Sequence, residues 1–248
     1  MKRIVVTGGA GFIGSNFVRC MLAAYPDVHI VTFDKLTYAG NLDNLKGIDE
    51  RRHTFIKGDI CDKEAIRAAM KGCGAVVNFA AGSHVDRSIM GADDFIATNV
   101  AGVHNICEAA RELDTPRVLL VSTDEVYGSI DEGSFTEQSP PRPGNPYSAS
   151  KAGGELIALA HFNTFGTPII ITRGSNTYGP YQYPEKVLPL FVTNALDNQP
   201  LPLYSGGENN VRDWLYVEDH CRGIETALHR GRPGEIYNIA GGNERRNI

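Results

Sequence analysis

The sequence predicts an α/β protein built on a doubly wound parallel sheet, with a smaller region at the C-terminal end. Short apolar runs bounded by turn residues recur over residues 1–172, and stretches whose apolar residues recur three and four apart lie between them. Strands that are apolar throughout indicate a parallel sheet, because its crossover helices cover both faces. The expected strands are Ile4 to Thr7, Ile30 to Phe33, Thr54 to Lys57, Ala75 to Phe79, Val118 to Ser122 and Pro168 to Thr172.

The pattern changes after Thr172. Gly174 to Pro184 is typical of a loop, prolines and glycines punctuate the chain around residues 200–207, and the regular alternation of strand and helix fades. No flexible linker separates the two parts. We therefore expect residues 1–172 and 173–248 to form two regions that pack directly against each other.

The composition argues against several classes of protein. The 24 Lys and Arg against 29 Asp and Glu give a formal net charge of −5, whereas nucleic-acid and membrane-surface binders usually carry a basic excess. The 5 cysteines form no Cys-x-x-Cys pair, so neither a metal site nor a disulfide framework is indicated. A strand pattern begins at Lys2, which leaves no room for a signal peptide, and the apolar runs are far shorter than the ~20 residues that span a membrane. These features predict a cytoplasmic protein with reduced thiols.

A glycine-rich loop follows the first expected strand and opens a helical stretch. In the run from Thr7 to Gly14, Gly8 allows a tight turn, Gly11 lets a pyrophosphate approach the backbone, and Gly14 lets the helix pack on the strand. The helix N-terminus adds free N–H groups and the positive end of its dipole. This placement predicts a Rossmann-type dinucleotide site; the alternative is that the glycines only punctuate a turn.

The second expected strand leads to Asp34, whose carboxylate can accept both hydroxyls of an adenosine ribose. A 2′-phosphate at that position would meet a like charge, so the sequence favours NAD over NADP, although the neighbouring Lys35 weakens this preference. Asp59 and Ile60 follow the third strand and are candidates for the adenine edge. The alternative for both carboxylates is a strand-end turn.

Tyr147 and Lys151 lie four residues apart and share a face if the segment is helical. A nearby ammonium stabilises a phenolate, so we expect Lys151 to lower the pKa of Tyr147, which can then accept a hydroxyl proton as hydride leaves carbon. The spacing alone is common on helix surfaces. Its position after the fifth expected strand favours the catalytic interpretation.

The run Ser122-Thr123-Asp124-Glu125 ends the fifth strand, at the edge where open α/β sheets bind their ligands. Thr123 is a candidate hydrogen-bond partner of Tyr147. Two adjacent carboxylates are unnecessary for hydride transfer, but the elimination of water needs a base for a carbon-bound hydrogen and an acid for the leaving hydroxyl. Asp124 and Glu125 supply such a pair, unless they form an ordinary acidic turn.

Six segments together resemble the dTDP-glucose 4,6-dehydratases, a family of extended short-chain dehydrogenases/reductases, and the likeness runs over the whole chain. The second and fourth of these segments carry it most specifically, and sister epimerases usually lack the Asp-Glu pair. The segments are Thr7 to Gly14, Asp34 to Asn41, Ser83 to Ser88, Ser122 to Gly128, Tyr147 to Lys151 and Arg212 to Trp214.

The resemblance implies an NAD-dependent hydro-lyase that converts dTDP-glucose to dTDP-4-keto-6-deoxyglucose. Tyr147, tuned by Lys151 and assisted by Thr123, takes the C4 hydroxyl proton while hydride passes to NAD. The ketone acidifies the C5 hydrogen, so that Glu125 removes it while Asp124 protonates the C6 hydroxyl, and hydride then returns to C6.

The resemblance also implies binding residues and an assembly. Residues 173–248 become the substrate region, and the chain is expected to form a homodimer through paired helices. Substrate contacts are implied for Ser83, Thr123, Asn176, Lys186, Arg212 and Asn247, of which Lys186 and Arg212 suit a diphosphate. Cofactor contacts are implied for Gly8, Gly11, Phe12, Ile13, Gly14, Asp34, Lys35, Thr37, Gly40, Asp59, Ile60, Ala80, Ala81, Thr98, Tyr147 and Lys151.

The chain departs from the family pattern in three places. Gly82 stands where the family usually has Glu, the run from Ser205 to Asn210 is one residue longer than usual, and the chain stops at Ile248 whereas relatives continue. We expect the first two departures to affect sugar or base specificity. The third either leaves the substrate region incomplete or reflects a sequence that covers only the ordered part of a longer chain. Two rivals stay open: an NDP-sugar 4-epimerase or decarboxylase, against which the Asp-Glu pair argues, and a non-catalytic NAD sensor, which would tolerate loss of the Tyr or the Lys.

Overall fold

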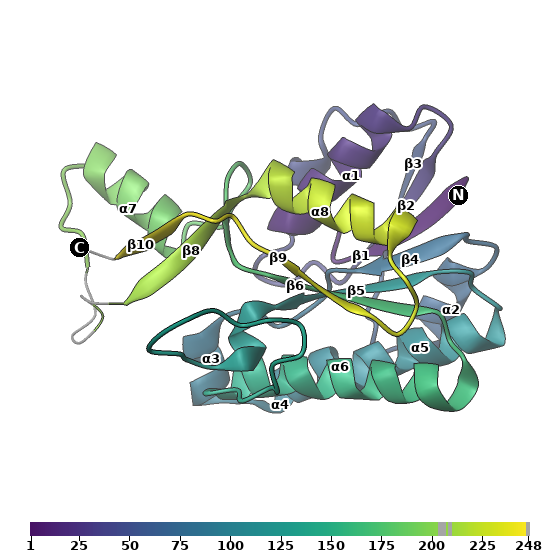
Figure 1. The fold of residues 1–248 in the computed structure, drawn as a ribbon. Helices are drawn as coiled ribbons and strands as arrows, with labels where there is room; N and C mark the ends of the chain where they lie inside the picture. The colour runs from purple at the N-terminus through teal and green to yellow at the C-terminus, as the bar shows by residue number, and fades with distance from the viewer. Residues whose placement is uncertain (203–206, 208–209, 247–248) are drawn as a thin grey trace.

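A seven-stranded sheet forms the centre of the protein, which a computed structural model describes over residues 1–202, 207 and 210–246 (Figure 1). Its strands pair in the order β3-β2-β1-β4-β5-β6-β9, and every pairing is parallel. The strands are β1 (Arg3–Thr7), β2 (His29–Asp34), β3 (His53–Lys57), β4 (Ala75–Asn78), β5 (Val118–Thr123), β6 (Ile169–Gly174) and β9 (Ile236–Ile239).

The strand order reverses at β1, which confirms the predicted doubly wound sheet. Val5 of β1 pairs with Val31 of β2 on one side and with Val76 of β4 on the other. All three side chains are buried, as their unbroken apolar runs predict for strands covered on both faces. Ligands of such sheets bind at the carboxyl ends of the strands, beside the reversal.

Helices cover both faces of the large sheet. Figure 1 shows α1 and α8 on one face and α2, α5 and α6 on the other, and an apolar cluster fills the space on each side. The helices are α1 (Phe12–Ala24), α2 (Lys63–Met70), α3 (Val85–Met90), α4 (Asp93–Ile96), α5 (Val103–Glu112), α6 (Pro146–Phe165), α7 (Val187–Leu196) and α8 (Val217–Arg230), with short 3₁₀ turns η1 (Leu42–Leu45) and η3 (Asp124–Tyr127).

Local signals fix both ends of the long helix α6. Asn145 caps its first turn by accepting a hydrogen bond from the backbone N–H of Ser148, and the Ser148 side chain bonds back to the capping residue. Pro146 occupies the first helical position, where its missing N–H costs nothing. Gly166 ends the helix in the left-handed conformation, at φ 70°. Tyr147 is therefore held in the first turn of a well-anchored helix.

One helical stretch contains a local irregularity. The apolar spacing from Phe95 to Leu113 is typical of a helix, and the structure is helical there, as α4, a π-helical segment over Ala97–Gly102, and then α5. Asn99, inside the π segment, is buried and bonds both to the backbone of Gly82 and to Ser150 of α6. The π-helical segment thus lies beside the helix that carries Tyr147. Such segments are frequent at functional sites.

A small three-stranded sheet extends from the carboxyl edge of the large one. It consists of β10 (Glu244–Arg246), β8 (Val211–Tyr216) and β7 (Asn176–Tyr178) in that order, and α7 lies beside it (Figure 1). The chain after residue 172 supplies this sheet, but it also supplies α8 and β9 to the large sheet. The division into regions 1–172 and 173–248 stays a prediction. None of the described helices is both long and apolar enough to cross a membrane.

Candidate active site

The glycine loop between β1 and α1 is packed so closely that two of its glycines have no room for a side chain. Gly8 has φ +67°, and a Cβ there would overlap the backbone N of Ala80, which follows β4. A Cβ at Gly14 would overlap the carbonyl oxygen of Gly8, so helix and loop are in direct contact. A Cβ at Gly11 meets only the Gly8 oxygen, at 3.3 Å, and no side chain caps the first turn of α1. Free helix N–H groups beside an open glycine fit a pyrophosphate.

Asp34 closes this loop at the end of β2. Its Oδ2 accepts the backbone N–H of Ala10 at 2.9 Å, and its Oδ1 accepts that of Leu36 at 2.8 Å. Burial raises the pKa of Asp34, against the two backbone hydrogen bonds, which lower it. Lys35 points to a different carboxylate, with its Nζ 2.7 Å from Oδ2 of Asp59. In the sequence, the charge of Lys35 weakened the predicted preference for NAD. In the structure, that charge is paired with Asp59 instead.

The other residues implied for the cofactor surround the same edge of the sheet. Gly40 packs against Asp34, since a Cβ there would lie 2.9 Å from Oδ1. Ile60 is buried, Thr37 is exposed, and Thr98 lies in the π segment. The remaining members of this set begin α1 or follow β4: Phe12, Ile13, Ala80 and Ala81.

Tyr147 is buried beside the end of β5. Its backbone N–H donates to Oγ of Ser88 at 3.1 Å, and its ring packs edge-on against Phe95, with 6.4 Å between ring centroids. Burial raises the pKa of Tyr147, the charge of Glu125 raises it further, and hydrogen bonding with Thr123 opposes them. The predicted lowering of this pKa is wrong for the free protein, because burial and a nearby carboxylate outweigh the stabilisation of the phenolate.

Lys151 lies one turn after Tyr147, on the side of α6 that faces β5. Its Nζ donates to the backbone oxygen of Val121 at 2.8 Å. Burial lowers the pKa of Lys151 to about 8, and the carboxylate of Glu155 opposes this shift. The ammonium is thus fixed in place between the helix and the strand.

The two adjacent carboxylates lie in η3, the turn that follows β5 directly. Thr123 organises this turn: its Oγ accepts the backbone N–H of Glu125 at 3.2 Å and donates to Oδ1 of Asp124 at 3.3 Å. Burial and the charge of Glu125 raise the pKa of Asp124 to about 6, while Arg212 acts in the opposite direction. One carboxyl group of the pair is therefore suited to hold a proton near neutral pH.

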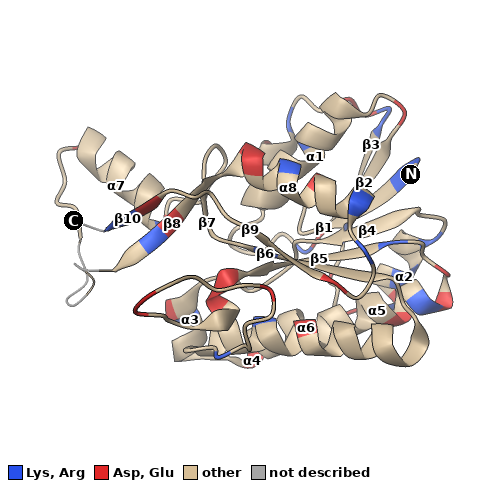
Figure 2. Ribbon diagram, viewed as in Figure 1, with Lys and Arg blue, Asp and Glu red and all other residues tan. Residues whose placement is uncertain are grey.

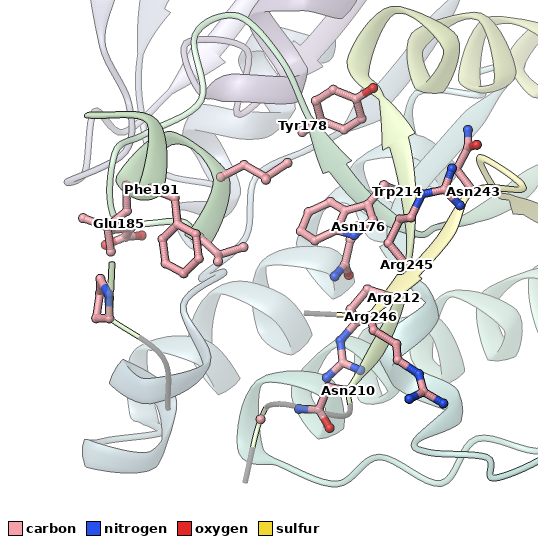
Figure 3. A pocket seen from close by; sticks show the side chains of 15 residues that line it. Asn176, Tyr178, Glu185, Phe191, Asn210, Arg212, Trp214, Asn243, Arg245 and Arg246 are labelled. Atoms are coloured by element: carbon pink, nitrogen blue, oxygen red, sulfur yellow. The ribbon is translucent and has the colours of Figure 1, made fainter. Parts of the chain in front are cut away.

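A cavity of about 760 Å³ opens between α7 and the small sheet. Figure 3 shows Phe191 of α7 on one side of it, and Asn176 and Arg212 on the other. The sequence predicted Asn176 and Arg212 as substrate contacts, but it missed the other cationic and aromatic residues of the lining. These are Tyr178, Phe191, Trp214, Arg245 and Arg246.

The missed arginines reach the cavity through strand pairing. Arg245 of β10 pairs in register with Arg212 of β8, and Arg246 follows it, so three guanidinium groups line one cavity. Their adjacency in the sequence was the one available signal, and it does not reveal the strand to which they pair. Three guanidinium groups suit a diphosphate.

Ser83 and Lys186, two further predicted substrate contacts, lie together. Nζ of Lys186 donates to the backbone oxygen of Ser83 at 3.0 Å, and the Ser83 hydroxyl lies 3.4 Å from that of Tyr38. Burial lowers the pKa of Lys186. Asn247, the last predicted contact, lies outside the described residues.

Comparison with known proteins agrees with this geometry. The family model described as GDP-mannose 4,6 dehydratase matches residues 5–247. The chain belongs to this family of nucleotide-sugar 4,6-dehydratases. A dTDP-glucose 4,6-dehydratase of Streptomyces niveus is 50% identical over 251 residues, which cover 99% of this chain and 74% of the relative.

Solved structures separate the dehydratases from the epimerases. The DesIV dTDP-glucose 4,6-dehydratase of Streptomyces venezuelae, with NAD and TYD bound, is 55% identical with a TM-score of 0.95, covering 99% of this chain and 77% of that one. A UDP-glucose 4-epimerase of Thermus thermophilus, in complex with NAD, is 32% identical with a TM-score of 0.89, covering 98% and 79%. The fold is shared by both, and the sequence is closer to the dehydratase.

One departure from the family pattern, Gly82, lies at a crowded point. A Cβ at Gly82 would lie 2.8 Å from the ring of Phe95, the ring that packs on Tyr147. A larger side chain there would require Phe95 to move. The second departure, the run from Ser205 to Asn210, falls mostly outside the described residues. Within the described ranges, no three His, Cys, Asp or Glu side chains gather so as to hold a metal ion.

Proposed function

We propose that this protein is an NAD-dependent hydro-lyase that converts dTDP-glucose to dTDP-4-keto-6-deoxyglucose. The observation that carries the proposal is the meeting of Thr123, Asp124 and Glu125 with Tyr147 at the carboxyl end of β5, where the first three each act on the ionisation of the Tyr147 phenol. When bound, NAD supplies a positively charged nicotinamide ring that accepts hydride from C4 and returns it to C6 of the sugar.

Residues around the strand-order reversal would hold the cofactor. Gly11 and the first turn of α1 offer backbone N–H groups to the pyrophosphate, and Asp34 accepts the ribose hydroxyls. Because Lys35 is paired with Asp59, Asp34 faces a 2′-phosphate without a cation to compensate its charge. This arrangement supports NAD rather than NADP.

Tyr147 would accept the C4 hydroxyl proton. A positive charge beside a buried phenol favours its phenolate. In the complete site the nicotinamide ring and the ammonium of Lys151 would supply such charge, and would oppose the burial that raises the pKa of Tyr147. Thr123 hydrogen-bonds the phenol oxygen, and Lys151 contributes an ammonium that is anchored on Val121. The C4 proton thus leaves toward a group that the fold holds in position.

Asp124 and Glu125 would then eliminate water across C5 and C6. The ketone at C4 acidifies the C5 hydrogen, which Glu125 removes as a proton and gives back to C5 when hydride returns to C6. Asp124, whose pKa is raised to about 6, donates a proton to the departing C6 hydroxyl. The adjacent carboxylates distinguish this site from one that only oxidises and reduces C4.

The cavity beside the small sheet would hold the nucleotide. Arg212, Arg245 and Arg246 supply donors for the diphosphate, and Trp214 and Phe191 supply flat apolar surface for the base. Ser83 and Lys186 are proposed to contact the sugar, because Lys186 follows the cavity residue Glu185 and its ionisation responds to the charge of Glu125.

A cytoplasmic homodimer is the proposed form of the protein. Two outward-facing apolar side chains of α6 support pairing of the helices with a second copy: Leu156 is 60% and Phe165 is 54% exposed. Cys20, Cys61, Cys73, Cys107 and Cys221 are all free thiols, which supports a reducing compartment.

Substitution of Glu125 by Gln tests the function directly. With dTDP-glucose in heavy water, Glu125→Gln should still develop the absorbance of the reduced cofactor but should neither exchange the C5 hydrogen nor lose water. Asp124→Asn is the matched control, since it should slow water loss while it leaves C5 exchange in place. Full dehydration by Glu125→Gln would contradict the assigned role, and a C4-epimerised product from the unaltered protein would favour the epimerase.

A further inference from the structure

A buried ion pair lies behind the proposed catalytic side chains and has no role in the steps above. Arg173 of β6 and Glu155 of α6 are each 3% exposed. Nε of Arg173 donates to the two carboxylate oxygens at 3.2 and 3.1 Å, and Nη2 donates to Oε2 at 2.6 Å. Apolar side chains of similar volume often give equal or greater stability than such a pair. Its presence next to the site therefore calls for a functional reason.

Glu155 faces the catalytic lysine from the same helix. Lys151 and Glu155 are one turn apart and are the charged residues of α6, which Figure 2 shows as an almost uncharged helix. Both line a small cavity of about 10 Å³, whose other lining residues are uncharged. The carboxylate acts against the burial that lowers the pKa of Lys151. The same carboxylate of Glu155 also forms the ion pair with the guanidinium of Arg173.

Arg173 also contacts the turn that carries the two carboxylates. Its guanidinium carbon lies 4.5 Å from the ring centroid of Tyr127, the last residue of η3. The ring is held in place by a hydrogen bond from its hydroxyl to Oδ1 of Asn238, at 2.8 Å, and by stacking on Phe135 at 4.9 Å. One buried guanidinium therefore connects the helix of the phenol and the lysine to the turn of the proposed acid and base.

We infer that Glu155 and Arg173 are positioning residues. Glu155 keeps Lys151 in its ammonium form, and Arg173 holds η3 in a fixed position relative to α6. This role rests on the proposed function, in which Lys151 assists Tyr147 and η3 supplies the acid and the base. Neither residue touches the substrate. Their loss should change the pH range and the balance of the two half-reactions rather than the binding of the nucleotide.

The ammonium role is tested with Glu155→Gln, which keeps the size of the side chain and removes its charge. The alkaline limb of the rate of C4 oxidation should move to lower pH by about one unit, because Lys151 loses its proton earlier. KM for dTDP-glucose should stay within about twofold. Asp219→Asn, which removes a carboxylate from an exposed pair with Arg222 on α8, is the control and should leave the limb in place. An unmoved limb in Glu155→Gln would overturn the role.

A second variant is used if Glu155→Gln does not fold because the buried charge of Arg173 has lost its partner. The double variant Glu155→Gln with Arg173→Gln removes both charges of the ion pair, and its two amides can bond to each other. The same shift of the alkaline limb is expected in this variant. An unshifted limb in the folded double variant overturns the inference as surely as in the single one.

The connecting role is tested with Arg173→Lys, which keeps the charge but lacks the forked donors and the flat face. Water loss should slow about tenfold relative to C4 oxidation, seen as accumulation of the reduced cofactor in a single turnover, while the alkaline limb stays in place. Equal slowing of both steps would overturn this role. Tyr147→Phe distinguishes failure of the proposed function from failure of the inference. An active Tyr147→Phe variant refutes the proposed function itself. If Tyr147→Phe is inactive but the Glu155 and Arg173 variants behave like the unsubstituted protein, only the inference is refuted.

Discussion

Replacing Asp124 by Asn should make the free protein more stable at neutral pH. The pKa of Asp124 rises from 3.8 to about 6 on folding, a shift of about 2 units, because burial and the charge of Glu125 disfavour its ionised form. At 1.36 kcal/mol per unit this corresponds to about 3 kcal/mol, which we reduce to ~1–3 kcal/mol because the side chain is only partly buried. Asn keeps an oxygen that can accept the hydrogen bond from Thr123.

The sign of the effect sets its pH range. Between pH 4 and 6 the unfolded chain loses the Asp124 proton while the folded chain keeps it, so the free energy of unfolding falls as pH rises through this window. The gain in Asp124→Asn should therefore be absent near pH 4 and complete above about pH 6. Denaturant unfolding at several pH values measures it, with the exposed Asp131→Asn as the control, expected within about 0.5 kcal/mol of the unaltered protein. A gain that does not depend on pH, or a loss at pH 8, would refute the burial argument.

Three further substitutions test the cofactor and nucleotide sites. Asp34→Ser should raise the preference for NADP over NAD by about tenfold or more in cofactor titrations, since it removes the charge that repels a 2′-phosphate; an unchanged ratio would remove Asp34 from the ribose site. Gly14→Ala should lower the free energy of unfolding by ~1–3 kcal/mol, because its Cβ overlaps the Gly8 oxygen, whereas Gly144→Ala, with no atom within 4 Å of its Cβ, should not. Arg246→Gln should raise KM for dTDP-glucose about fivefold to thirtyfold with little change in kcat, and an unaltered KM in steady-state kinetics would place the diphosphate elsewhere.

Local patterns in the sequence were sufficient for the large sheet up to β6. The runs at Val5, Val76 and Ile170 are apolar on both faces, and such runs have few alternatives to a covered parallel strand. The sequence did not predict that the chain returns to the large sheet as β9. Ile236–Ile239 is a strand of only 4 residues, and nothing within it indicates that it pairs with β6 rather than with the small sheet.

The sequence indicated which side chains come close to one another, but not their electrostatics. Asp124 and Glu125 lie near Tyr147, and Lys151 lies one turn after Tyr147 against β5, while their catalytic roles stay predictions. The direction of the Tyr147 pKa depends on burial and on the distance to Glu125, which no spacing reveals. The basic lining of the cavity likewise depends on the antiparallel pairing of Arg245 with Arg212, a long-range contact.

The links between the two sheets are very short. Ser175 alone separates β6 from β7, and β8 runs directly into α8 at Tyr216 and Val217. The connection from β9 to β10 is held by Asp213, whose carboxylate accepts the backbone N–H groups of Gly241 and Asn243. Such joints leave little freedom for a hinge. If the cavity holds the nucleotide as proposed, its site and that of the sugar ring would therefore move together, and a shift of the bound diphosphate would also shift the reacting carbons.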